Sequence, residues 1–306
     1  MQQINYFNLS RIFILGIASG LPIVLVLSTF GIWLVDLNVS KTTIGLFALA
    51  TVPYSLKFLW SPFIDGIKIP YFSKLLGHRK SWIILSQIGL IISIITLSIL
   101  DHQNSLFLSA IVILIITFFS ATQDIVIDAY RIELANESEQ GIFATFVIYG
   151  YRIGMLISGA GALFLASSFS WMFVYMLMAV ILVFISLLVM TFPETQHRVS
   201  NKKLSYLDWS RKYIISPFVN FAKNDNFILI LVFIILYKFG DAFAGIMTNP
   251  FLLEIGFDKI DIASIVKTVG LGFTLIGLSI GGVMVAKYNL KNSLIFCGVL
   301  QAISRS

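Results

Sequence analysis

Charged residues and cysteine are both scarce in this 306-residue sequence. Asp, Glu, Lys and Arg make up only 12% of the residues, whereas hydrophobic residues make up 58%. A soluble domain carries about 25% charged residues and needs a polar shell, so this composition excludes a soluble globular enzyme. The single cysteine, Cys297, excludes a disulfide framework and a multi-cysteine metal site. An aromatic content of 14% excludes a disordered chain.

Motifs for metal binding, nucleophilic catalysis and nucleotide binding are also missing. The three histidines, His78, His102 and His197, are far apart and have no metal-ligand spacing. No Ser/His/Asp set can be placed within the apolar stretches, and no glycine-rich phosphate loop occurs. The sequence therefore predicts neither a metal nor a cofactor. If the protein moves a solute, the energy is expected from an ion gradient or from the solute's own gradient.

Long apolar stretches fill most of the chain. A helix needs about 20 apolar residues to cross the ~30 Å hydrocarbon core. Eight stretches fit this length, near residues 12–35, 43–64, 82–100, 106–127, 142–166, 171–191, 227–250 and 262–286. A ninth apolar stretch begins near Ser293 and leaves too few residues to span. The sequence therefore predicts an all-α polytopic membrane protein.

One connection between the spans is long, polar and basic. It covers residues 193–226 and separates six spans from the rest. We therefore expect an N-terminal six-helix half over residues 1–192, a linker loop over 193–226 and an incomplete C-terminal half over 227–306. The first six helices are expected to fold as a unit, and the remainder to pack less well.

The basic residues between the spans are distributed unequally. Fourteen Lys and Arg residues fall in loops on one side of the predicted membrane, and only Lys41 and Lys259 fall on the other. The positive-inside rule then predicts a cytoplasmic N-terminus. Anionic lipid headgroups account for the net charge of +6, so no nucleic-acid partner is expected.

Several charged residues lie inside the predicted spans, where each costs about 2.5–3.5 kcal/mol even on an insertion scale. Arg152 lies near the middle of the fifth span. It either forms a buried ion pair with Asp124 or Asp128, or lines a polar substrate cavity. Lys57 lies nearer the inner face of the second span, where its long side chain either reaches the interface or faces the same cavity.

Two pairs of charged residues share a helical face. Lys238 and Asp241, three residues apart, form either a neutralised pair or part of a proton-coupled site. Asp124 and Asp128 are four residues apart at the inner end of the fourth span. They either anchor loops through ion pairs or act as a switch in a conformational change.

Small residues recur every four positions in three spans. The fifth span has Gly150, Gly154, Ser158 and Ala162, the first has Gly16 and Gly20, and the eighth has Gly277 and Gly281. This spacing predicts close helix packing. Pro22 and Pro53 lie inside spans and predict broken helices, which are typical of transporters with a midplane site.

Several sequence blocks resemble known transporters. Asp65-Gly66 followed by Gly77-His78-Arg79-Lys80 resembles the acidic–Gly–basic loop signature of the major facilitator superfamily. Ala18–Pro22, Pro53–Pro62, Gln123–Glu133, Gly150–Met155 and Tyr237–Phe243 resemble the AmpG family of muropeptide permeases. The resemblance implies a permease of the bacterial inner membrane that imports anhydro-muropeptides, which are anionic sugar–peptide fragments of the cell wall, with protons. It also implies functional roles for Asp124, Asp128, Arg152, Lys238 and Asp241.

The resemblance leaves alternatives open. The superfamily has twelve helices in two halves, so this chain is expected to be truncated at its C-terminus. An alternative is a transport-inactive remnant with no uptake of its own, and another is a permease that needs a dimer or a partner chain to supply the missing helices. The cargo is alternatively an acyl-coenzyme A or a nucleotide. A multi-span enzyme such as an acyltransferase is disfavoured because no His–Asp set lies near the membrane.

Overall fold

The computed structural model describes residues 6–195, 206–237, 239, 254–256 and 270–303. Its contacts divide the chain into two compact units, Met1–Lys203 and Leu204–Ser306. Every described element is helical. Lys238 and Asp241, two of the charged residues singled out above, lie outside the described residues.

The first unit contains six helices that are long and apolar enough to cross a membrane. They are Tyr6–Asp36, Lys41–Leu59, His78–Ile99, Leu106–Leu134, Glu137–Ala166 and Trp171–Met190. These helices confirm the first six predicted spans. The fourth runs seven residues beyond the predicted end at 127, because Tyr130 is buried and continues the apolar face. Asp128 and Arg131 therefore lie within the helix rather than after it.

The second predicted span is interrupted near its inner end. Three short helices, α3 (Lys41–Leu46), α4 (Val52–Leu56) and α5 (Ser61–Gly66), and two 3-10 turns make up the region predicted as one helix over 43–64. The helical run stops at Leu59, and α5 begins after Trp60 with Pro62 in its first turn. Proline lacks the amide hydrogen that would continue the helix, which explains the break.

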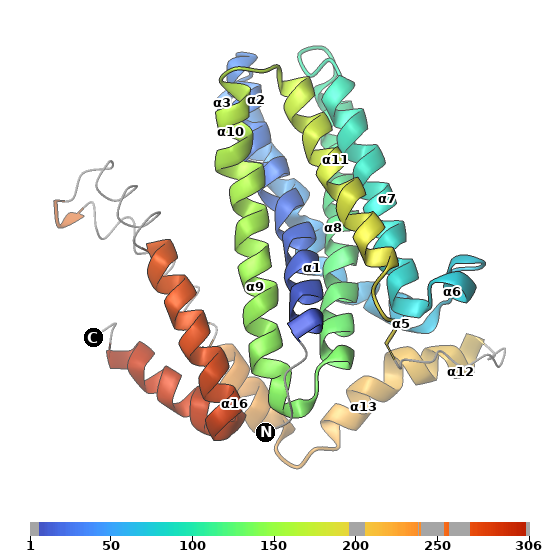
Figure 1. Cartoon of the computed structure of the whole chain (residues 1–306), viewed down its shortest axis with the longest axis vertical. Helices are drawn as coiled ribbons and strands as arrows, with labels where there is room; N and C mark the ends of the chain where they lie inside the picture. The colour runs from blue at the N-terminus through green and yellow to red at the C-terminus, as the bar shows by residue number, and fades with distance from the viewer. Residues whose placement is uncertain (1–5, 196–205, 238, 240–253, 257–269, 304–306) are drawn as a thin grey trace. The chain divides into compact units, whose positions relative to one another are not determined.

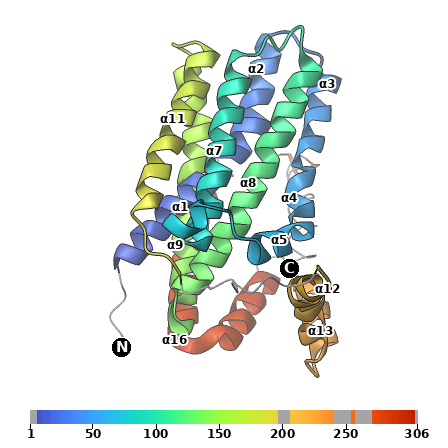
Figure 2. The same cartoon turned by 90° about the vertical axis from the view of Figure 1, so that its right-hand side faces the viewer.

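The first helix contacts three of the other five spans, the fourth, fifth and sixth. Helix α1 (Tyr6–Val24) lies along α9 (Gln140–Leu156) and also contacts α8 (Leu106–Leu134) (Figure 1). Helix α7 (His78–Ile99) packs between α8 and α11 (Trp171–Met190). The second span lies at an edge beside α8 (Figure 2) and is the least buried of the six.

Glycines permit the close approach of α1 and α9. A Cβ atom at Gly20 would lie 2.0 Å from the carbonyl oxygen of Tyr151, and one at Gly150 would lie 2.0 Å from that of Phe13. Gly16 and Gly154 meet the opposite backbone at similar distances. The predicted small-residue packing is therefore confirmed for the first and fifth spans.

Both of these spans contain a π-helical turn, which leaves backbone groups free for partners on other helices. Leu25–Thr29 follows α1, and Ile157–Gly161 follows α9 before α10 (Ala162–Ala166). Tyr175 donates to the carbonyl of Leu25 at 2.9 Å, and Thr29 donates to that of Ser158 at 2.6 Å. Tyr175, Thr29 and Ser158 are all buried, so these two hydrogen bonds hold the π-helical turns from inside the bundle.

The second unit departs from the sequence prediction in two places. The stretch predicted as a linker loop contains α12 (Tyr206–Ser210), a π-helical turn (Arg211–Ile215) and α13 (Ser216–Ala222). Residues 287–292, which were predicted as a loop before a ninth stretch, are helical and belong to α16 (Gly270–Ile303), which bends partway along its length (Figure 1); its apolar part is Gly272–Tyr288. Those six residues contain neither Gly nor Pro, so nothing in them ends a helix. Among the described atoms, a Cβ at Gly277 or Gly281 would meet nothing within 4 Å, so the predicted packing of this pair is not seen there.

Candidate functional site

Pro22 creates a free carbonyl group inside the bundle. Proline has no amide hydrogen, so the carbonyl of Ala18, four residues earlier, has no donor at position 22. The side chain of Gln123 on α8 supplies one, with its Nε2 3.0 Å from the Ala18 oxygen. Both residues are fully buried. This bond fixes α8 against α1 at the level of Asp124.

Asp124 is bonded across the same helix pair. The hydroxyl of Ser19 donates to Oδ1 of Asp124 at 2.5 Å. Lys57, from the turn after α4, and Asp128, one turn further along α8, lie within electrostatic range of this carboxyl group. Asp124 therefore has a hydroxyl donor on α1 and a cation nearby on the second span.

Two tyrosines complete a polar cluster around Asp124. Tyr54 on α4 lies near the Asp124 carboxyl, the Ser120 hydroxyl and the Tyr151 ring. Tyr151 on α9 lies in turn near Asp124 and Arg152. The cluster thus draws on the first, second, fourth and fifth spans. Sequence reasoning missed Ser19, Tyr54, Ser120 and Tyr151, although Tyr54 precedes Lys57 by three residues and Ser120 precedes Asp124 by four.

Arg152 is half-buried on α9. Its predicted ion pair with Asp124 or Asp128 is not seen. Among the described residues, no ion pair joins it to Asp124 or Asp128. Its guanidinium contacts the sulfur of Met155 at 4.0 Å, and its buried Nε has no hydrogen-bond partner there. The part of the chain that the structure describes therefore does not support the buried ion-pair interpretation for these two carboxylates: Ser19 binds one of them, and the other lies 3.8 Å from Arg131.

Asp128 differs from Asp124. Its carboxylate lies 3.8 Å from the guanidinium of Arg131 on the same helix, and its side chain is 57% exposed. For this residue the structure fits the interpretation as part of a charged helix end.

A second charged cluster lies at the start of α7. Arg79 is 3% exposed and binds Asp65 at 2.6 Å and Glu133 at 2.5 Å. Glu194, which follows α11, accepts from the backbone amides of Arg79 and Lys80. Burial raises the pKa of the Glu194 carboxyl above its usual value. The cluster ties α5, α7, α8 and the end of α11 together.

The predicted loop signature therefore lies partly inside the protein. Arg79 and Lys80 were counted among residues facing lipid headgroups, but both are buried in the first turn of α7. The Lys80 ammonium donates to the carbonyl of Phe192 at 2.7 Å. Gly77 precedes this turn with a φ of 90°, a conformation that favours glycine. Sequence reasoning did not pair Arg79 with Glu133 or Glu194, because they follow it by 54 and 115 residues.

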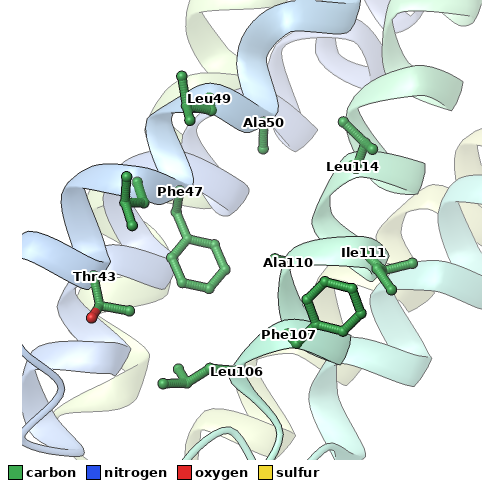
Figure 3. Close-up of a pocket in the computed structure, with 10 residues that line it drawn as sticks. Thr43, Phe47, Leu49, Ala50, Leu106, Phe107, Ala110, Ile111 and Leu114 are labelled. Carbon is green, nitrogen blue, oxygen red and sulfur yellow. The ribbon is translucent and has the colours of Figure 1, made fainter.

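A separate pocket lies between the second span and α8 (Figure 3). It has a volume of about 460 Å³, and only Thr43 contributes a polar side chain to its lining. The other lining residues are Leu46, Phe47, Leu49, Ala50, Leu106, Phe107, Ala110, Ile111 and Leu114. Without a charged group this pocket does not suit a charged solute, so the polar cluster around Asp124 is the stronger candidate site.

Comparison with known proteins decides the family. The model described as "Major Facilitator Superfamily" matches residues 12–304, which is nearly the whole chain. The chain belongs to this superfamily. An all-α, multi-pass membrane protein of transporter type is therefore established, in agreement with the sequence prediction.

Curated relatives of this superfamily chain are named as transporters or permeases. "Putative transporter AmpG 4" of Rickettsia conorii is 37% identical over 301 residues, which cover 97% of this chain and 72% of the relative. "Putative transporter AmpG 3" of Rickettsia prowazekii is 36% identical over 303 residues, covering 96% and 71%. "Anhydromuropeptide permease" of Escherichia coli K12 is 36% identical over 310 residues, covering 100% of this chain and 61% of the relative. The chain thus spans less than two thirds of the Escherichia coli protein.

Proposed function

We propose that this superfamily chain belongs to a permease that carries anhydro-muropeptides across the bacterial inner membrane, inward and with protons. The observation that carries the proposal is the identity of 36% over the full chain to a protein named anhydromuropeptide permease. The polar cluster around Asp124 supports it, because a carboxyl group there lies within electrostatic range of Lys57 between spans. The predicted cytoplasmic N-terminus belongs to the same proposal.

Arg152 and Lys57 are the proposed substrate-binding cations. Peptide stems carry carboxylates, and a guanidinium binds a carboxylate with two parallel hydrogen bonds. Arg152 is suited to this because it has no ion-pair partner among the described residues and lies beside Tyr151. Lys238, outside the described residues, is the third proposed cation.

Asp124 is the proposed proton-coupling residue. In its charged form it attracts Lys57 and accepts the hydrogen bond from Ser19. Protonation removes the charge, and the attraction to Lys57 ends. Lys57 is then available to a substrate carboxylate. Proton binding and substrate binding would thus favour each other, which is what symport requires. Asp128 and Asp241 are proposed as secondary carboxylates of the same switch.

Three other interpretations are less well supported. An acyl-coenzyme A or a nucleotide would also need a basic site, but none of the relatives described above is named for such a cargo. A transport-inactive remnant is not favoured by relatives named as transporters. A membrane enzyme finds no support in the family or in the relatives' names.

Binding to the purified chain tests the role of Arg152. Arg152→Ala removes the charge-assisted bonds, each contributing about 1.5–3 kcal/mol, so the affinity for radiolabelled anhydro-muropeptide should fall by about tenfold or more. Lys41→Ala removes one positive charge from an exposed position and should leave the affinity unchanged. Equal affinity of Arg152→Ala and the parent chain would exclude Arg152 from the site.

A further inference from the structure

A continuous helix precedes the first apolar helix of the second unit. It consists of α12, the π-helical turn and α13, and it covers Tyr206–Ala222. We call it the connecting helix. Nothing proposed above gives this helix a role.

The connecting helix has a narrow polar row and a broad apolar face. Residues four apart lie on the same side of a helix. One such row is polar throughout and consists of Asp208, Lys212, Ser216 and Asn220. The other rows are mainly apolar and include Leu207, Trp209, Tyr213, Ile215, Phe218, Val219 and Phe221.

Five of these seven apolar side chains are exposed, and Trp209 and Tyr213 are half-buried. Leu207 is 76% exposed and Phe218 is 69% exposed, and Ile215, Val219 and Phe221 are also exposed. The rings of Trp209 and Tyr213 pair at 5.8 Å, with the Lys212 ammonium 5.1 Å from the Tyr213 ring. Such aromatic rings beside a basic side chain are typical of the boundary between water and hydrocarbon.

The orientation of the helix relative to its neighbour also points to the membrane surface. Leu207–Ala222 and the apolar helix Phe227–Tyr237 meet at an angle of 95°. If Phe227–Tyr237 enters the bilayer along its normal, the connecting helix lies parallel to the surface. Arg211 and Lys212 are exposed along it and Lys223 directly after it, and residues 196–226 contain six Lys or Arg against two Asp. This positive charge complements anionic headgroups.

We propose that the connecting helix lies in the interface of the bilayer, with its apolar face at the acyl-chain boundary and its basic residues on anionic lipid headgroups. Amphipathic helices with bulky apolar residues on one face bind membranes in this manner. The inference does not depend on the transported substrate. It would remain valid if the chain carried another cargo.

Fluorescent labels on the full chain in vesicles test this placement. In a Cys297→Ser background, Phe218→Cys places a label on the apolar face and Asn220→Cys places one on the polar row. The vesicles contain phosphatidylglycerol and phosphatidylcholine. The label at 218 should be quenched several-fold more by spin-labelled acyl chains than by iodide, and the label at 220 should show the reverse. Ile215→Cys and Ser216→Cys form a second pair if either first variant does not insert.

Two results would overturn the proposal. Equal quenching of both labels by iodide would place the helix in water. Protection of the label at 218 from both quenchers would mean that its apolar face packs against protein. The lipid charge is tested separately with Arg211→Gln combined with Lys212→Gln. This variant should reduce acyl-chain quenching at 218 in vesicles with phosphatidylglycerol, and an unchanged value would contradict the role of anionic lipid.

Discussion

Pro22 and Gln123 act together, because the proline removes a backbone donor and the glutamine replaces it. Gln123→Leu keeps the side-chain size but leaves the buried Ala18 carbonyl without its donor. We expect a loss of about 1–3 kcal/mol in the free energy of unfolding. Denaturant unfolding of the purified chain in detergent measures this loss.

A double-mutant cycle separates this effect from general packing. Pro22→Ala restores an amide hydrogen that can bond to the Ala18 carbonyl, so Gln123→Leu should cost clearly less in that background. The same cost in both backgrounds would show that Gln123 does not act by capping this carbonyl.

His102 lies in the loop between α7 and α8, and we expect it to make the stability of the protein depend on pH. It is 2% exposed, hydrogen-bonds with Ser109 at 2.7 Å, and lies against the rings of Phe30 and Trp33. Burial lowers the pKa of His102 below 6.5, so near and just below that pH the folded protein binds fewer protons than the unfolded chain. Stability should therefore fall as the pH falls below about 6.5.

Thermal unfolding between pH 7.5 and 5 measures this decrease, which should be smaller in His102→Gln than in the parent chain. Ser109→Ala keeps the imidazole and should retain the decrease. The nearby carboxyl group of Asp101 has a pKa that is lowered by its hydrogen bonds to Asn104. Any contribution of Asp101 to stability is therefore lost only at more acidic pH. If the unfolding temperature decreased with pH as steeply in His102→Gln as in the parent chain, another group would be responsible for the effect.

At the scale of elements, the contact between α1 and α9 depends on glycine. Gly20→Ala would place a methyl group 2.0 Å from the Tyr151 carbonyl oxygen, so the helices must separate. We expect a loss of about 3 kcal/mol, at the upper end of the overpacking range. Gly277→Ala meets no described atom within 4 Å and should be neutral or stabilising by up to about 1 kcal/mol. A thermal shift assay compares the two, and equal unfolding temperatures would contradict the contact.

Hydropathy predicted the helices well because each membrane crossing needs a long apolar run. It predicted their ends less well. The break at Trp60 depends on where Pro62 falls within a run that is apolar on both sides. The helical conformation of residues 287–292 was missed because a polar helical turn and a polar loop have the same mean hydropathy. The connecting helix was missed because its apolar residues alternate with polar and basic ones, so that the mean hydropathy over residues 193–226 stays low although one face is apolar.

The candidate site was only partly predictable. A charge inside a span is conspicuous in a sequence, so Asp124, Arg152 and Lys57 could be singled out. Their partners could not, because a single Ser or Tyr in an apolar helix has no distinctive pattern. Ser19 reaches Asp124 over 105 positions in the chain, and only the packing of α1 on α8 brings them together.

For the whole molecule, the proposed transport mechanism links the Asp124 cluster to the movement of a charged solute. The Arg79 cluster holds four elements of the first unit together at a different level and makes no direct bond to Asp124 among the described residues. We therefore assign structural anchoring to the Arg79 cluster and coupling to Asp124. This division separates variants that unfold the protein from variants that only stop transport.

Uptake of labelled anhydro-muropeptide in a permease-null Gram-negative host tests the central claim most directly. Cells that express the chain should accumulate label above the empty-vector level, and an uncoupler of the proton gradient should abolish the accumulation. Asp124→Asn should insert in the membrane at the parent level but lose most uptake, whereas Lys41→Ala should retain it. No uptake by the inserted parent chain, or uptake by Asp124→Asn at the parent rate, would contradict the account.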